Sequence, residues 1–122
     1  MSKDKPSRRQ EEIVNAYFSF LNSHIESVIS GASNDFLPLS EIAHQLHISH
    51  QHLTDTIKQA NGQHPCYYYD LKIIEAAKEM LKASDKTVTE VAYTLTYDPS
   101  NFSKFFKKIV GVSPGTWQRE NT

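Results

Sequence analysis

The sequence predicts an all-α protein built around two copies of one helical unit. Apolar residues recur at helical spacing through most of the chain, and no segment of any length alternates apolar and polar residues as a half-buried strand does. In addition, VTEVAYTLTYDPSNFSKFFKK (residues 88–108) repeats the hydrophobic pattern of LSEIAHQLHISHQHLTDTIKQ, which begins 49 residues earlier. The repeat indicates two similar helical subdomains.

Length and composition are those of a small globular protein. The 122 residues suffice for one domain or for two small subdomains that share a helix. No apolar run approaches the ~18 residues of a membrane span, and no secretory signal follows the charged N-terminus. Cys66 is the only cysteine, which excludes an internal disulfide and makes a reducing, cytoplasmic setting the expectation.

Four segments are expected along the chain. Residues 1–9 are polar and should form a disordered lead or linker. The first subdomain, 10–65, begins with an amphipathic helix from Gln10 to about Ser30. A long connecting helix over 66–83 leads to the second subdomain, 84–122. The residues expected to face inward on the first helix and the connecting helix are Ile13, Tyr17, Phe20, Leu21, Ile25, Val28, Ile29, Leu71, Ile74, Ala77, Met80 and Leu81.

The first subdomain contains a short helix, a tight turn and a longer helix. Ser40 is expected to cap the short helix, which runs through about Leu46. Ser49 should cap the longer helix, which runs through about Ala60 and ends at Gly62.

The second subdomain repeats this layout. Thr89 is expected to cap a helix through Leu95. Asp98 and Pro99 should open the last strong helix, which Gly111 ends.

The repeat preserves the residues that a helix-turn-helix needs. The identical pairs are Glu41/Glu90, Ala43/Ala92, Leu46/Leu95, Lys58/Lys107, Gly62/Gly111 and Pro65/Pro114. The small Ala43 or Ala92 allows the second helix to cross closely over the first, and Leu53 or Phe102 fills the space between them. Charge differs between the copies: residues 35–66 are acidic with five histidines, whereas basic residues outnumber acidic ones in 84–119.

Three strings of residues carry a resemblance to a known family. They are Leu39-Ser40-x-Ile42-Ala43-x-x-Leu46-x-Ile48-Ser49-x-x-x-Leu53, then Ala77-x-x-Met80-Leu81, then Asp98-x-Ser100-x-Phe102-Ser103-x-Phe105-Phe106-Lys107-Lys108-x-x-Gly111-x-Ser113-Pro114. In them the chain resembles the DNA-binding domain of the AraC/XylS family of bacterial transcription regulators. The resemblance implies about seven helices in two helix-turn-helix subdomains, whose second helices enter successive major grooves of double-stranded DNA. It also implies transcription activation through recruitment of RNA polymerase, without a cofactor.

The chain departs from the family in its turns. Glycine is usual there, but this sequence has His47 and Thr96. Because a non-glycine residue at positive φ is strained, we expect these turns to adopt another geometry. The second turn, Thr96-Tyr97-Asp98, also looks one residue short.

The outer face of the last helix is the main candidate for DNA contact. Its candidates are Ser100, Asn101, Ser103, Lys104, Lys107 and Lys108. Asn101 suits an adenine edge and Lys104 a guanine edge, and both lie on the first two turns, where a recognition helix reaches bases. Lys107 and Lys108 lie further along and should meet phosphates.

The first subdomain offers His50, Gln51, Thr54 and Lys58. Gln51 and Thr54 can hydrogen-bond to bases, whereas Asp55 would repel phosphate unless it accepts from a cytosine amino group. We therefore expect the second subdomain to supply most of the affinity and the first to supply positioning or selectivity.

Other functions have weaker support. The spacing of His44 and His47 could suit a metal, but no carboxylate or thiol is grouped with them. Cys66 and His64 lack a third orienting group, so no enzyme activity is expected. The competing hypothesis is a helical protein-interaction module with little or no DNA affinity, suggested by the near-neutral charge and by Asp55. A stand-alone regulator and the C-terminal part of a longer one, dimeric through an upstream domain, both remain open.

Overall fold

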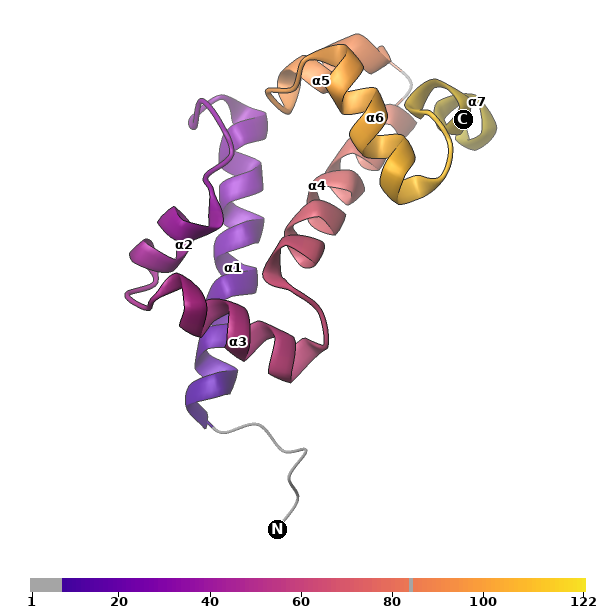
Figure 1. The fold of residues 1–122 in the computed structure, drawn as a ribbon. Coiled ribbons are helices and arrows are strands. Elements are labelled where there is room, and N and C mark those ends of the chain that lie inside the picture. The colour runs from indigo at the N-terminus through magenta and orange to yellow at the C-terminus, as the bar shows by residue number, and fades with distance from the viewer. Residues whose placement is uncertain (1–7, 84) are drawn as a thin grey trace. The chain divides into compact units, whose positions relative to one another are not determined.

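The computed structural model describes residues 8–83 and 85–122, which form seven helices and no strand (Figure 1). These are α1 (Arg8–Ser30), α2 (Leu39–Gln45), α3 (His50–Asn61), α4 (Pro65–Lys82), α5 (Val88–Thr94), α6 (Pro99–Val110) and α7 (Pro114–Asn121). The all-α prediction is confirmed. Positions 1–7 of the expected lead lie outside the described residues, whereas Arg8 and Arg9 belong to α1. No described helix is long and apolar enough to cross a membrane.

The helices belong to two compact units, and α1 and α4 each contribute to both. Unit 1 comprises the residues up to Ser23 and Leu37–Asp70, and thus contains the α2–α3 pair. Unit 2 comprises His24–Phe36 and Leu71–Thr122, and thus contains α5, α6 and α7. Each unit therefore holds one complete helix-turn-helix.

Unit 1 is held together by aliphatic residues and one buried tyrosine. Ile42, Leu53 and Ile57 are fully buried between α2, α3 and their neighbours. The Tyr17 hydroxyl donates a hydrogen bond to the Pro65 carbonyl oxygen at 2.8 Å, which joins α1 to the first residue of α4. Burial raises the pKa of Tyr17, so the phenol remains a neutral donor at physiological pH.

The sequence favours Leu53, Ile57 and Ala60 as the inward residues of α3, and burial differs from this expectation at two positions. Thr56 is only 3% exposed, whereas Ala60 is exposed. Ala60 lies in the last turn of the helix, next to the left-handed cap at Gly62, and so beyond the packed part of α3. Among the other residues expected to face inward, those that are half-buried rather than buried are Phe20, Ile29, Leu71 and Met80.

Unit 2 has an aromatic core. Phe102 and Phe106 are fully buried with ring centroids 5.9 Å apart, and Trp117 of α7 meets Phe106 edge-on at 6.1 Å. Tyr97 stacks on Phe105 at 5.3 Å with an interplanar angle of 14°. Aromatic pairs of this kind contribute about 0.5–1.5 kcal/mol of stability beyond the contribution of the apolar area that they bury. The phenylalanines found only in the second copy of the repeat therefore determine how α6 packs.

The longer helix of each pair begins as predicted, but α2 does not. Ser49 caps α3 by accepting from the His52 N–H, and Asp98 caps α6. In α2 the N-cap residue is Pro38, and no side chain caps the helix. The expected cap at Ser40 is therefore wrong, because Ser40 already lies within the first turn.

The start of α5 also lies earlier than expected. Thr87 rather than Thr89 is its N-cap, and it forms a reciprocal capping box with Glu90. A capping box needs a glutamate or glutamine three residues after the cap. Thr87 has Glu90 at that position, whereas Thr89 has Ala92 and cannot form the box.

Candidate nucleic-acid interface

Each helix-turn-helix contains a non-glycine residue in the left-handed region. His47 has φ 62° and Thr96 has φ 65°, so the expectation of another turn geometry is wrong. The Thr96 hydroxyl donates to Asp35 Oδ1 at 3.1 Å, which helps to hold the strained residue. The imidazole of His47 has no such partner among the described residues.

The two turns have the same length and the same backbone hydrogen bonds. The Ile48 N–H donates to the Ala43 carbonyl oxygen at 3.1 Å, and the Tyr97 N–H donates to the Ala92 carbonyl oxygen at 2.9 Å. These two bonds join residues that correspond at the 49-residue offset. The second turn is therefore as long as the first, and positions on α3 and α6 can be compared one by one.

The face of α6 opposite the buried Phe102 and Phe106 is polar and cationic. Ser100, Asn101, Lys104, Lys107 and Lys108 are exposed, and Ser103 is half-buried. None of the three lysines forms an ion pair within the described residues. All six residues predicted on this helix are thus accessible, and no carboxylate lies close enough to form an ion pair with its lysines, although the charge of Asp98 interacts with that of Lys104.

The cap of α6 changes what its first turn can offer a ligand. The Ser100 hydroxyl donates to Asp98 Oδ2 at 2.6 Å, and the Ser100 and Asn101 N–H groups donate to the same oxygen. The Ser100 side chain is the main cause that lowers the pKa of Asp98, so the cap stays ionised. Because its hydroxyl proton is committed, Ser100 is left as an acceptor, whereas the Asn101 amide keeps both functions.

The outer face of α3 has a different chemistry. His50, Gln51 and Lys58 are exposed, and Thr54 is half-buried. The Gln51 Nε2 donates to Asp55 Oδ1 at 2.9 Å, so a candidate base reader and the carboxylate expected to repel phosphate form a pair. Their i,i+4 spacing on a helix is the signal that predicts such a contact.

Three side chains of unit 2 that reach the surface were not identified from the sequence: Lys78 is half-buried, and Lys82 and Tyr93 are exposed. The ammonium groups of Lys78 and Lys82 lie 5.6 Å and 6.0 Å from the centroid of the Trp117 ring. The i,i+4 spacing of these lysines could have indicated a shared face. Tyr93 on α5 is 64% exposed.

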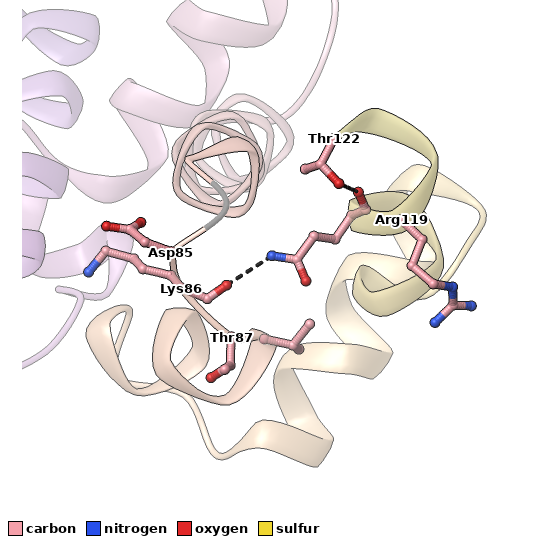
Figure 2. Close-up of a pocket in the computed structure, with 7 residues that line it drawn as sticks. Asp85, Lys86, Thr87, Arg119 and Thr122 are labelled. Carbon is pink, nitrogen blue, oxygen red and sulfur yellow. Dashed lines mark hydrogen bonds between the residues drawn. The ribbon is translucent and has the colours of Figure 1, made fainter.

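A shallow hollow of about 430 Å³ lies between α7 and the segment that precedes α5 (Figure 2). The Gln118 amide donates to the Leu81 carbonyl oxygen at 3.1 Å and to the Lys86 carbonyl oxygen at 2.9 Å, and so joins α7 to the end of α4 and to this segment. Most of the residues that line the hollow are polar, and none of them is a nucleophile paired with a base.

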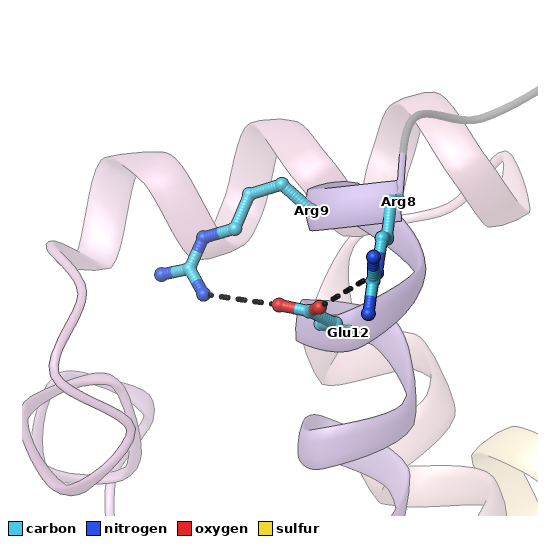
Figure 3. A network of polar contacts seen from close by, with 3 residues as sticks. All are labelled: Arg8, Arg9 and Glu12. Atoms are coloured by element: carbon cyan, nitrogen blue, oxygen red, sulfur yellow. Dashed lines mark ion pairs between the residues drawn. The ribbon is translucent and has the colours of Figure 1, made fainter.

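The start of α1 carries a small charged network (Figure 3). Glu12 pairs with Arg8 and with Arg9, in both cases at 3.6 Å. The three side chains are largely exposed, and exposed ion pairs add little to stability. Among the residues that the structure describes, no group of three or more histidine, cysteine or acidic side chains could hold a metal ion.

Comparison with known proteins places the chain in a family. A family model described as a helix-turn-helix domain matches residues 42–120. The MmsAB operon regulatory protein of Pseudomonas aeruginosa is 31% identical over 84 residues, which are 68% of this chain and 27% of that protein. An uncharacterized HTH-type transcriptional regulator of Bacillus subtilis, YtdP, is 29% identical over 86% of this chain and 14% of its own length. The chain thus spans about a quarter or less of these relatives.

Solved structures agree with this placement. The C-terminal domain of AraT, a response regulator from Geobacillus stearothermophilus, matches with a TM-score of 0.76 and 28% identity, over 98% of this chain and 88% of that one. An AraC-type regulator from Chromobacterium violaceum has the same TM-score at 17% identity, over 95% and 97%. The DNA-binding domain of AdpA, solved with a target DNA, has the same fold at a TM-score of 0.65 and 18% identity, over 82% and 90%. The chain therefore belongs to the AraC-type family of helix-turn-helix DNA-binding domains found in bacterial transcription regulators.

Proposed function

We propose that this chain binds double-stranded DNA sequence-specifically and regulates transcription, with α3 and α6 reading successive major grooves. The observation that carries the proposal is the accessible face of α6, where Lys104, Lys107 and Lys108 have no ion-pair partner among the described residues. Unpaired lysines on the second helix of a helix-turn-helix suit the phosphates and base edges of a major groove. Membership of the family supports the same function.

The residues on α6 divide into two roles. Asn101 and Lys104 lie in the first two turns and contact base edges, where amide and ammonium groups can discriminate between bases. Lys107 and Lys108 lie in the last turn and contact phosphates, which position the helix without specifying sequence. In unit 1, Lys58 corresponds to Lys107 and takes the same role.

Two binding experiments test the proposal. Fluorescence anisotropy of a random duplex should show binding that weakens as salt rises, and Lys107→Ala should reduce the slope of log K against log salt by about 0.9. Lys104→Ala should instead weaken binding to a selected site more than binding to random duplex. Lys86→Ala is the matched control, because it removes the same charge from unit 2 without touching α6.

The competing function is a protein-interaction module, which the Asp55 carboxylate on α3 and the net charge of −1 favour. Absence of binding to any duplex at low salt would support it and reject DNA binding. A variant set in which Lys104→Ala leaves affinity intact while Gln51→Ala abolishes it would reject the dominant role of unit 2.

Recruitment of RNA polymerase is the family-based part of the proposal. Transcription in vitro from a promoter that carries the selected site should rise when the chain is added. An unchanged or reduced transcript would reject activation, while leaving DNA binding itself to the anisotropy measurement.

A further inference from the structure

Gln51 and Asp55 on α3 correspond to Ser100 and Lys104 on α6. The correspondence rests on the 49-residue offset that the turn hydrogen bonds share and that also relates His47 to Thr96. In each helix the two residues are four positions apart, so each pair occupies successive turns of one face. Of the two correspondences, that of Asp55 with Lys104 places a carboxylate acceptor where the other helix has an ammonium donor.

The pair on α3 offers acceptors. Gln51 uses one Nε2 proton on Asp55 Oδ1 at 2.9 Å, which sets the amide orientation and leaves its Oε1 as an acceptor and its second Nε2 proton as a donor. Asp55 is exposed and makes no ion pair with Lys58 or with any other described cation, so its second oxygen also remains. The free carboxylate oxygen of Asp55 attracts an exocyclic amino group and repels a carbonyl oxygen, and Gln51 Oε1 adds a second acceptor.

The equivalent place on α6 offers donors. Lys104 is exposed, and its ammonium group carries three N–H donors and no acceptor. A lysine on a recognition helix suits the O6 and N7 acceptors of guanine. Lys104 therefore favours the base-edge groups that Asp55 disfavours.

We propose that the Gln51–Asp55 pair makes α3 select a base with an amino group on its major-groove edge, adenine or cytosine. Lys104, at the corresponding position of α6, selects a base with a carbonyl group on its major-groove edge, guanine or thymine. The inference rests on the proposed function. Every base pair carries one amino and one carbonyl group in the major groove, and inverting the pair exchanges their places. An inverted base pair is thus disfavoured at the position that each of these side chains contacts.

Selection of bound duplexes from a random library tests this inference with the whole chain. Duplexes are selected in parallel with four proteins: the wild type, Gln51→Ala, Asp55→Asn and, as the control, Glu41→Gln. Glu41 suits this purpose because it accepts a similar i,i+4 bond from Gln45 at 3.5 Å, but on α2. Asp55→Asn and Glu41→Gln remove the same charge, so a general electrostatic gain appears in both.

The wild type should enrich adenine or cytosine at one position, and Gln51→Ala should erase that preference. Asp55→Asn should relax the same position, while Glu41→Gln leaves it unchanged. Inverting that base pair should weaken wild-type binding roughly tenfold and Asp55→Asn binding less than about threefold. Unchanged circular dichroism of the variants verifies their fold.

Two results separate the inference from the proposed function. Guanine or thymine at the position sensitive to Gln51, no such position, or an undiminished preference in Asp55→Asn would overturn the inference while DNA binding stands. Failure of the wild type to enrich any sequence would overturn the proposed function itself.

Discussion

His47 and Thr96 should respond differently to replacement by glycine, although both occupy the left-handed region. Their φ values, 62° and 65°, are nearly equal, so the backbone strain that glycine relieves is similar. Only Thr96 has a side-chain partner, because its hydroxyl donates to Asp35 at 3.1 Å. Glycine at position 96 therefore relieves strain and loses a hydrogen bond, whereas glycine at position 47 only relieves strain.

The expected free energies follow from these contributions. A residue with a Cβ in the left-handed region carries about 1–2 kcal/mol of backbone strain, which replacement by glycine relieves. Glycine also raises the entropy of the unfolded chain, which lowers the stability of the folded state by about 0.4–1 kcal/mol. His47→Gly should therefore raise the free energy of unfolding by about 0.8 kcal/mol. Loss of the bond to Asp35, with a net contribution of about 0.5–1.5 kcal/mol, should bring Thr96→Gly close to zero.

Urea unfolding at pH 8 measures both variants. Far-UV circular dichroism reports both units, and fluorescence of Trp117, the only tryptophan in the chain, reports unit 2. Thr96→Gly is repeated in an Asp35→Ala background, where the hydrogen bond is already absent. There the substitution should be stabilising by about 0.8 kcal/mol, as at position 47.

Two outcomes would refute this reasoning. A His47→Gly variant less stable than the wild type by more than about 0.5 kcal/mol would mean that backbone strain at this residue is outweighed by the unfolded-chain entropy or by lost side-chain contacts. An equal effect of Thr96→Gly with and without Asp35 would mean that the hydrogen bond does not hold the second turn.

Three further predictions concern single contacts. Tyr17→Phe should lower the free energy of unfolding of unit 1 by about 1 kcal/mol, because it removes the buried hydrogen bond to the Pro65 carbonyl oxygen; a loss below about 0.3 kcal/mol in urea unfolding would contradict this. Burial lowers the pKa of His24, so the folded state binds its proton less readily than the unfolded chain; stability of unit 2 should be complete above the unfolded pKa of about 6.5 and fall as pH drops below it. Trp117 fluorescence at pH 7.5 and 5.5 measures that loss, which His24→Gln should abolish. Thr87→Ala should cost about 1 kcal/mol through loss of the capping box, while Thr89→Ala, its control, should change the melting temperature little.

Residues close together in the sequence determined where the helices of both repeat copies lie and where α3 and α6 begin and end. Apolar spacing placed the helices, Gly62 and Gly111 ended α3 and α6 in the left-handed region, and Ser49 and Asp98 opened them. Each of these effects operates within about one helical turn, so neighbouring residues suffice to predict it. The same applies to the six polar residues predicted on α6, whose exposure follows from the opposite positions of Phe102 and Phe106. Their DNA contacts stay a prediction.

Other features depended on groups that meet only in the tertiary structure. His24 is buried on the ring edge of Phe36, with centroids 5.8 Å apart, although histidine at a helix surface would be equally compatible with the sequence. The strained Thr96 is held by Asp35, which lies 61 residues earlier. Pairwise contacts at such separations are set by how the helices pack and not by spacing along the chain, so only the folded structure could reveal them.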